Sequence, residues 1–135
     1  MQTILAVENE SFKLKINSSD KSRHNFVPRR HTADVSCCRN SFAAFQIVIM
    51  CDGHACINLG NSPWFSEFYG AENIHVRHNG ELTPVMNHIG MLLGDDGELY
   101  ADMLKSSPVT DAAANVPSGI FVRFEISENV KPGKY

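Results

Sequence analysis

The chain lacks the sequence signals of membrane insertion and of export. A transmembrane helix needs about 20 consecutive apolar residues, and no segment of this sequence approaches that length. The start, from Met1 to Asn9, has neither a basic region nor an apolar stretch long enough for a secretory signal. We therefore expect a soluble chain that has no membrane partner.

An excess of basic charge is absent as well. Lysine and arginine number 12 and aspartate and glutamate number 15, which gives a formal net charge of −3. Proteins that follow the phosphate backbone of nucleic acids normally carry a positive charge balance or a basic stripe. The composition therefore argues against nucleic acid as a partner.

No short motif with a recognised chemical mechanism occurs. The sequence has no nucleophile elbow, no phosphate-binding glycine loop and no convincing catalytic triad. Asp95, Asp96 and Glu98 lie close together, but they lack the ordered alternation of oxygen ligands found in calcium loops, so this segment is typical of a turn. We expect no catalytic residue and no cofactor in this chain.

Sustained helical periodicity is also missing, and short extended segments take its place. The longest apolar run extends from Arg39 to Met50 and is rich in aromatic and β-branched residues. In an extended chain, successive side chains point to opposite sides. Phe45, Ile47 and Ile49 then share one side, and Ala44, Gln46, Val48 and Met50 share the other. The run predicts a strand that is buried on both faces.

Gln46 is the polar exception within this apolar run. A primary amide carries two donors and a carbonyl, and leaving such a group dry and unpaired costs roughly 1–3 kcal/mol. We expect Gln46 to hydrogen-bond the backbone of a neighbouring strand or loop, and so to fix the path of that segment.

Two other segments alternate between apolar and polar residues. Phe12 to Ile16 predicts a half-exposed strand, and Ile120 to Ile126 predicts an amphipathic strand with Arg123 and Glu125 on its polar face. Each has one face for a core and one for water.

Turn signals complete the expected arrangement. Ala55 to Leu59 predicts a short strand that closes a hairpin with the apolar run, and Asn79-Gly80 predicts the turn of a second hairpin. Val109 to Gly119 consists largely of small residues without periodicity, so it predicts a long loop.

Short strands at near-regular spacing predict an all-β fold, an antiparallel β-sandwich of the immunoglobulin or jelly-roll kind. No linker, repeat or low-complexity segment divides residues 1–135, so we expect a single domain. Lys134-Tyr135 begins what resembles one further strand. We therefore expect a fragment of a longer chain that lacks its last strand, and a homodimer formed through the exposed strand edge.

The four cysteines are Cys37, Cys38, Cys51 and Cys56, in or beside strand-like sequence. This placement predicts reduced thiols in the core and favours a reducing compartment such as the cytoplasm. Cys51, His54 and Cys56 lie within six positions, and Cys37 or Cys38 would complete a tetrahedral zinc site. Their spacing lacks the paired knuckles of structural zinc sites. A small metal-binding protein remains one alternative function.

Aromatic residues gather between Pro63 and Gly70, beginning with Trp64. Such rings commonly plug the end of a β-sandwich, but an exposed ring also packs against the apolar face of a sugar. A free-standing carbohydrate-binding module that uses Trp64 is therefore a second alternative function.

Three motifs stand in order along the later part of the chain. The first comprises Arg39-Asn40 and Phe45-Gln46, which lead into the aliphatic run. The second is Tyr100-Ala101-Asp102-Met103-Leu104. The third places Val116-Pro117-Ser118-Gly119 before a strand and Pro132-Gly133-Lys134-Tyr135 after it.

Together these motifs resemble the amino-terminal β-sandwich domain that precedes the catalytic barrel in glycoside hydrolases of the family-123 type. The corresponding family patterns are Arg-Asn-Glu, Ser-Phe-Gln, Tyr-Pro-Asp-x-Leu, Val-Pro-x-Gly and Pro-Gly-x-Tyr. Ser41 stands in place of the glutamate, Ala44 in place of the serine and Ala101 in place of the proline. The resemblance covers roughly residues 35–135.

The resemblance implies a non-catalytic accessory domain that packs on a carbohydrate-active barrel and helps to shape its substrate cleft. In that family the catalytic acid and its neighbouring carboxylate belong to the barrel. No catalytic residue therefore carries over to this chain, and its implied partner is the catalytic barrel of the same parent protein.

Overall fold

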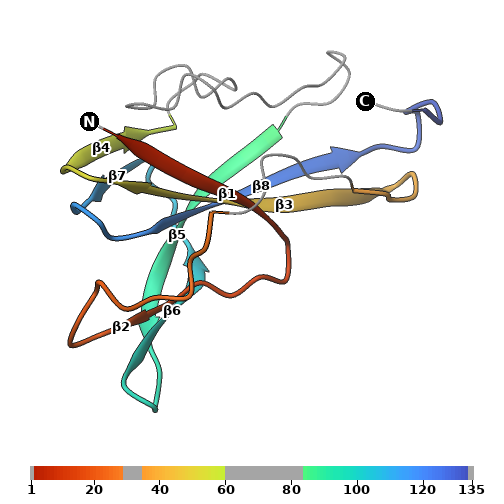
Figure 1. Cartoon of the computed structure of the whole chain (residues 1–135). Coiled ribbons are helices and arrows are strands. Elements are labelled where there is room, and N and C mark those ends of the chain that lie inside the picture. The colour runs from red at the N-terminus through yellow and green to blue at the C-terminus, as the bar shows by residue number, and fades with distance from the viewer. Residues whose placement is uncertain (1, 29–34, 60–83, 134–135) are drawn as a thin grey trace.

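A computed structural model describes residues 2–28, 35–59 and 84–133 (Figure 1). The strands in these ranges are β1 (Thr3–Asn9), β2 (Lys15–Asn17), β3 (Ser41–Cys51), β4 (Ala55–Asn58), β5 (Pro84–Leu93), β6 (Glu98–Leu104), β7 (Val109–Ala112) and β8 (Ser118–Ile126). Over the same ranges, no helix has the length and apolar character needed to cross a bilayer.

The strands form two antiparallel sheets. Six strands make one sheet in the order β1-β3-β8-β5-β6-β2, and β4 pairs with β7 in the other. The predicted all-β fold, with antiparallel strands in a sandwich-like arrangement, is confirmed.

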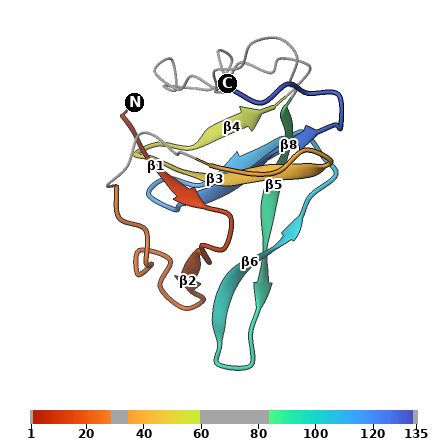
Figure 2. The same ribbon diagram turned by 90° about the vertical axis from the view of Figure 1, so that its right-hand side faces the viewer.

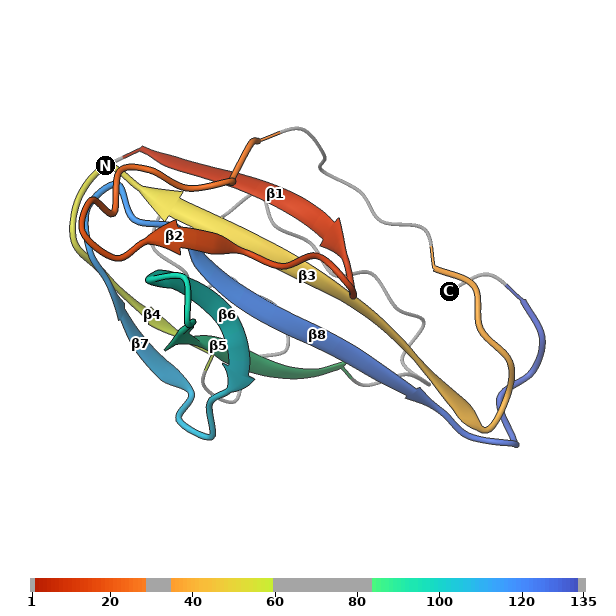
Figure 3. The same cartoon turned by 90° about the horizontal axis from the view of Figure 1, so that it is seen from below.

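The larger sheet curls at β5. Residues 84–89 of this strand pair with β8, whereas residues 89–93 pair with β6, and the register shifts between Gly90 and Met91. The shift is a β-bulge, which bends a strand and increases its local twist. As a result, β6 and β2 cross over one side of β3 and β8 (Figures 2 and 3).

β3 lies at the centre, and from Ala44 onward it is largely buried on both faces, as its apolar run predicts. One cluster, on the side of β4 and β7, includes Ile47, Ile49, Ile57, Ala112, Ile120 and Val122. A second cluster, on the side of the curled β2–β6 layer, includes Ala6, Leu14, Ile16, Val48 and Ala101. Burying a large aliphatic side chain contributes roughly 1.5–3 kcal/mol, so both layers depend on β3.

The start of β3 is set by a turn. Asn40 has a φ of 58°, in the left-handed region that asparagine tolerates better than most residues. The strand therefore begins at Ser41 and does not continue back into residues 35–38.

The predicted hairpin between Ala55–Leu59 and the apolar run is wrong. β3 has no free edge for β4, because β1 and β8 occupy its two sides. Asp52 to His54 instead carry the chain into the second layer, where β4 pairs with β7. The hairpin predicted at Asn79-Gly80 lies outside the described residues.

The strands β1, β6 and β7 were not predicted from the sequence. Val109 to Gly119, predicted as a loop, contains all of β7 and the first residues of β8. β7 is short and polar by itself, and its pairing with β4 makes it a strand. β1 pairs with β3 from Thr3↔Cys51 to Asn9↔Phe45, and no strand was predicted there.

Other local predictions are confirmed. Residues 12–16 alternate between partly or fully buried and exposed positions, although β2 itself begins only at Lys15. Ile120, Val122 and Phe124 of β8 are buried in the first cluster. The segment with the acidic residues is a turn, in which the Gly94 N–H donates to the Glu98 carbonyl at 2.8 Å.

The cysteines only partly follow their prediction. Cys51 is buried, 2% exposed, at the end of β3. Cys37, Cys38 and Cys56 are exposed, so the expectation of core thiols is wrong for these three. Cys56 is exposed because the core-facing positions of β4 are taken by Ala55 and Ile57.

Gln46 anchors the connection between β1 and β2, as expected. Its side chain is 4% exposed, and its amide nitrogen donates to the carbonyls of Phe12 at 2.6 Å and Glu10 at 2.9 Å. The Asn9 carbonyl lies at 3.4 Å. Because these three carbonyls lie at the end of β1 and just after it, the amide holds the chain where it turns toward β2.

Replacement of Gln46 by methionine keeps most of the side-chain volume and removes the amide. We expect the free energy of unfolding to fall by about 1–3 kcal/mol, because the carbonyls of Glu10 and Phe12 lose their donor. Urea unfolding followed by circular dichroism measures this change. The matched control Gln2→Met changes an exposed side chain and should stay within about 0.5 kcal/mol. Equal stabilities of the two variants would contradict the anchoring role.

A second buried polar group joins the two sheets. His88 of β5 is 1% exposed, and its Nε2 lies 3.1 Å from the Ile57 carbonyl of β4 and 3.0 Å from the Pro108 carbonyl before β7. A neutral ring protonated at Nε2 donates to both carbonyls. Burial lowers the pKa of His88 below its ordinary value of 6.5; the Lys105 charge acts in the same direction, and the two carbonyls oppose it.

The lowered pKa of His88 makes stability depend on pH. Below about pH 6.5 the unfolded chain binds a proton at this residue that the folded chain does not bind. The free energy of unfolding should therefore fall with decreasing pH, by up to about 1.4 kcal/mol per pH unit, until the folded-state pKa is reached.

His88→Gln keeps a side-chain N–H donor but does not titrate. Between about pH 6.5 and 5, its unfolding free energy should depend less on pH than that of the unchanged protein, as measured by urea unfolding. His54→Gln serves as the control because this side chain is 69% exposed. If both variants kept the full pH dependence, the assignment to His88 would fail.

Candidate functional site

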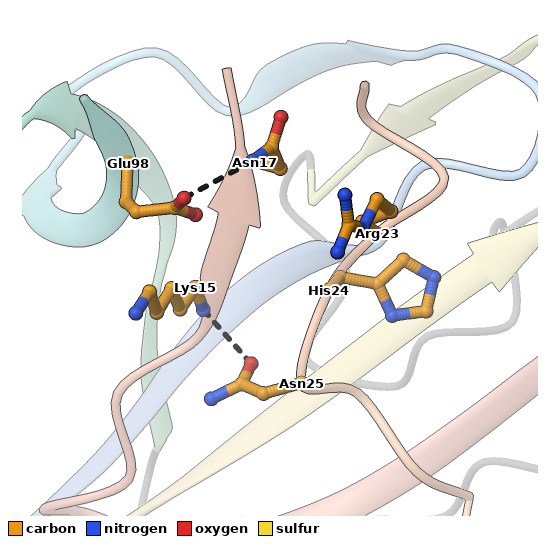
Figure 4. A pocket seen from close by; sticks show the side chains of 6 residues that line it. All are labelled: Lys15, Asn17, Arg23, His24, Asn25 and Glu98. Atoms are coloured by element: carbon orange, nitrogen blue, oxygen red, sulfur yellow. Dashed lines mark hydrogen bonds between the residues drawn. The ribbon is translucent and has the colours of Figure 1, made fainter. Parts of the chain in front are cut away.

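An open groove with a volume of about 250 Å³ lies on the outer face of β2 (Figure 4). Its lining residues are Lys15, Asn17, Arg23, His24, Asn25 and Glu98. Lys15 and Asn17 alternate with Ile16, which is buried in the second core cluster. The same alternation that places Ile16 in the core therefore turns Lys15 and Asn17 toward the groove.

One wall of the groove is a chain segment that imitates a neighbouring strand. Ile16 and His24 form an isolated antiparallel bridge, and the Asn17 N–H donates to the Arg23 carbonyl at 2.8 Å. Asn25 extends this pairing through its side chain, which accepts from the Lys15 N–H and donates to the Lys13 carbonyl, both at 2.9 Å.

The opposite wall is the start of β6. Asn17 and Glu98 are cross-strand partners, and the Asn17 side-chain amide donates to the Glu98 carboxylate at 3.1 Å. The carbonyl end of the same amide accepts from the N–H groups of Ser19 at 3.0 Å and Asp20 at 2.8 Å. Asn17 thus holds the Glu98 carboxylate and the following turn in one arrangement.

Charge in the groove is mixed, with cations in excess. Lys15 and Arg23 contribute two permanent positive charges, and Glu98 contributes the only carboxylate among the lining residues. The ammonium of Lys15 lies 5.8 Å from the centre of the Tyr100 ring, a cation–π contact.

The ring beneath Lys15 is held in place by Asp96. The Tyr100 hydroxyl donates to the Asp96 carboxylate, and this bond lowers the pKa of Asp96 and raises the pKa of Tyr100. Asp96 therefore remains an anion and Tyr100 a neutral phenol around neutral pH, with one face of the ring turned to Lys15.

A second surface lies on the part of β3 and β8 that the curled layer does not cover (Figure 3). We call it the open face and define it by Phe42, Val85, Phe121 and Arg123, whose strand positions share one side of the sheet. Phe42 is 50% exposed and Val85 is 46% exposed. The Arg123 guanidinium lies 6.0 Å from the Phe42 ring centre and 3.0 Å from Glu125.

The sequence-predicted site residues do not assemble into one site. Cys51 is buried, whereas Cys56 is exposed and His54 lies 3.8 Å from Asp111. Within the ranges that the structure describes, no group of three or more His, Cys, Asp and Glu residues is placed to hold a metal ion. Trp64 lies outside those ranges.

The sequence analysis did not identify the groove. Alternation predicts that Lys15 faces solvent, but nothing in the sequence places Arg23, after the next turn, or the distant Glu98 beside it. Pairing of β2 with β6 and the bridge to His24 bring them together. Asn17 and Asn25, in the polar segment after Ile16, are the local feature of the sequence that indicates an ordered turn at this place.

Comparison with known proteins adds no relative to these observations: neither a family model nor a curated protein matches the chain. The likeness to the amino-terminal domain of family-123 glycoside hydrolases therefore rests on the sequence motifs alone. It remains a hypothesis.

Asn25→Ala tests how the groove wall is built. The variant loses two hydrogen bonds to the backbone of residues 13–15, so we expect the unfolding free energy to fall by about 1–2 kcal/mol. Hydrogen exchange at the Lys15 amide should accelerate as well. Asn129→Ala, at an exposed position, should change neither quantity. An unchanged exchange rate of the Lys15 amide in Asn25→Ala would contradict the role of Asn25 in holding this wall of the groove.

Proposed function

We propose that this chain is a non-catalytic accessory β-domain of a glycoside hydrolase-like protein. In this proposal its open face packs against the catalytic barrel of the same parent protein and supports the barrel near its substrate cleft. The observation that carries the proposal is the open face itself, an aromatic and aliphatic surface beside an arginine on the part of β3 and β8 that the curled layer leaves uncovered (Figure 3).

The chemistry of the open face favours a protein partner. Aromatic residues and arginine are enriched at the centres of protein interfaces and carry much of their binding energy. Phe42 and Val85 are about half exposed, so a partner would remove further apolar surface from water at roughly 25 cal/mol per Å². Arg123, already held over the Phe42 ring, would lose little side-chain freedom on binding.

The roles of the motif residues also support a scaffold rather than a reaction centre. Asn40 forms the left-handed turn before β3, and the Phe45 ring stacks on Phe124 with ring centres 6.4 Å apart. Gln46 anchors the β1–β2 connection. At Gly119 an added Cβ would lie only 3.1 Å from Cδ1 of Ile89. Each of these residues serves the packing of the sandwich.

Two sequence hypotheses remain predictions beside this proposal. A free-standing carbohydrate-binding module would use Trp64, which lies outside the described residues. A homodimer would use a strand edge. β1 is a terminal strand of the larger sheet, with β3 as its only strand neighbour among the described residues.

The packing proposal is tested with two valine variants. Val85 and Val109 are 46% and 41% exposed, and only Val85 lies on the open face. We expect Val85→Asp to weaken binding of this domain to the separately expressed barrel of the same parent by about tenfold or more, as measured by calorimetric titration. Val109→Asp should bind like the unchanged domain. Equal affinities of the two variants would exclude the open face as the interface.

The non-catalytic character needs a separate assay. The purified chain should release no more product from a panel of aryl glycosides than a buffer blank does, whereas a preparation that contains the barrel should be active. Turnover by the chain alone, persisting through repeated purification, would overturn the accessory role even if the open face bound the barrel.

A further inference from the structure

We infer that the groove on β2 binds an oxyanion, a carboxylate or a phosphate group carried by a small ligand. The groove shares no residue with the open face. Its ligand is therefore a separate question from the proposed accessory function, and either proposal can fail alone.

The first support is the state of the two groove cations. Elsewhere on the surface, Lys13 pairs with Asp102 and Arg123 pairs with Glu125. Among the described residues, neither Lys15 nor Arg23 forms a salt bridge of this kind. The Lys15 ammonium contacts the Tyr100 ring, and its charge is one of the weaker influences that lower the pKa of Asp96. The charge of Arg23 contributes only the weakest of the influences on the pKa of Asp20.

The second support is their spacing. The bridge between Ile16 and His24 places Asn17 opposite Arg23 and Lys15 opposite Asn25. Lys15 and Arg23 are therefore diagonal neighbours, a relation that separates Cα atoms by about 7–8 Å and is bridged by long side chains. Figure 4 shows the Arg23 guanidinium near Asn17, with the Lys15 ammonium on the other side of β2. One anion contacts both groups only when the flexible Lys15 side chain turns back across β2 toward Arg23 (Figure 4).

The third support is that the backbone under these cations is fixed. Asn25 ties residues 13–15 to the wall segment, and Asn17 holds the following turn. A binding group on an ordered frame loses less conformational entropy when its ligand arrives. The guanidinium of Arg23 offers two parallel N–H donors that match the oxygens of a carboxylate or phosphate.

Glu98 sets the expected sign of one variant. Its carboxylate accepts a hydrogen bond from Asn17 on the β6 side of the groove. The negative charge of this carboxylate repels an incoming anion. Removing that charge should strengthen anion binding, whereas removing the Arg23 charge should weaken it. A neutral ligand held only by hydroxyl contacts would not respond in opposite directions to these two changes.

The test is a titration of the isotope-labelled chain, followed by amide chemical shifts, with three probes: inorganic phosphate, glucuronate and glucose. We expect saturable shifts at Lys15, Arg23 and Glu98 with at least one of the two anions. Binding of phosphate alone, glucuronate alone or both identifies the source of the oxyanion, and each supports the site. Glucose that binds as well as glucuronate, or anions that give no saturable shifts there, would overturn it.

Four variants complete the test. Arg23→Gln should lower the affinity for the bound anion about tenfold, the effect of losing one charged hydrogen-bonding group, and Lys15→Gln should lower it to a smaller extent. Glu98→Gln should raise the affinity. The matched control Lys21→Gln removes the same charge from the same loop at an exposed residue outside the groove. If Lys21→Gln weakened binding as much as Arg23→Gln, the effect would be general charge attraction, and the site would be rejected.

Discussion

The structure depends on one requirement, that the central part of β3, from Phe45 to Ile49, is covered on both faces and paired along both edges. β1 and β8 satisfy its backbone on either side, while the β4–β7 pair and the curled β2–β6 layer cover its two faces. Because the part of β3 from Phe45 to Ile49 has a strand on each edge and a core cluster on each face, neighbouring segments must find partners elsewhere. This explains why β4 leaves the central sheet and why the larger sheet has to curl at β5.

Two buried polar side chains specify how the layers meet. Gln46 reaches from β3 to the backbone after β1, and His88 reaches from β5 to the backbone of β4 and to the segment before β7. Apolar contacts are not directional and would tolerate several placements of these segments. A hydrogen-bond donor directed at particular carbonyls tolerates few placements of those segments. The polar groups therefore add little area to the core but determine where the peripheral segments lie.

The same arrangement leaves two surfaces with distinct chemistry. Curling of the sheet covers only part of β3 and β8, so Phe42, Val85 and Arg123 remain on an open face. It also brings β2 to the border of the sheet, beside a groove lined by Lys15 and Arg23. Among the described residues that line this groove, the two cations outnumber the single carboxylate, that of Glu98. An apolar face beside an arginine is typical of surfaces that bind another protein. A groove lined by cations is typical of sites that bind an oxyanion.

Features that depend on neighbours along the chain could be predicted from the order of the amino acids. We could predict the alternation in β2 and β8 and the apolar run of β3. We could also predict the turn before Glu98 and the need of Gln46 for backbone partners. Features that depend on strand pairing became visible only in the folded chain. β7 is a strand because β4 lies beside it, and the groove exists because β6 and the His24 segment flank β2. Alternation along a chain records which side of a strand is apolar, whereas the identity of the strand alongside depends on contacts between distant residues.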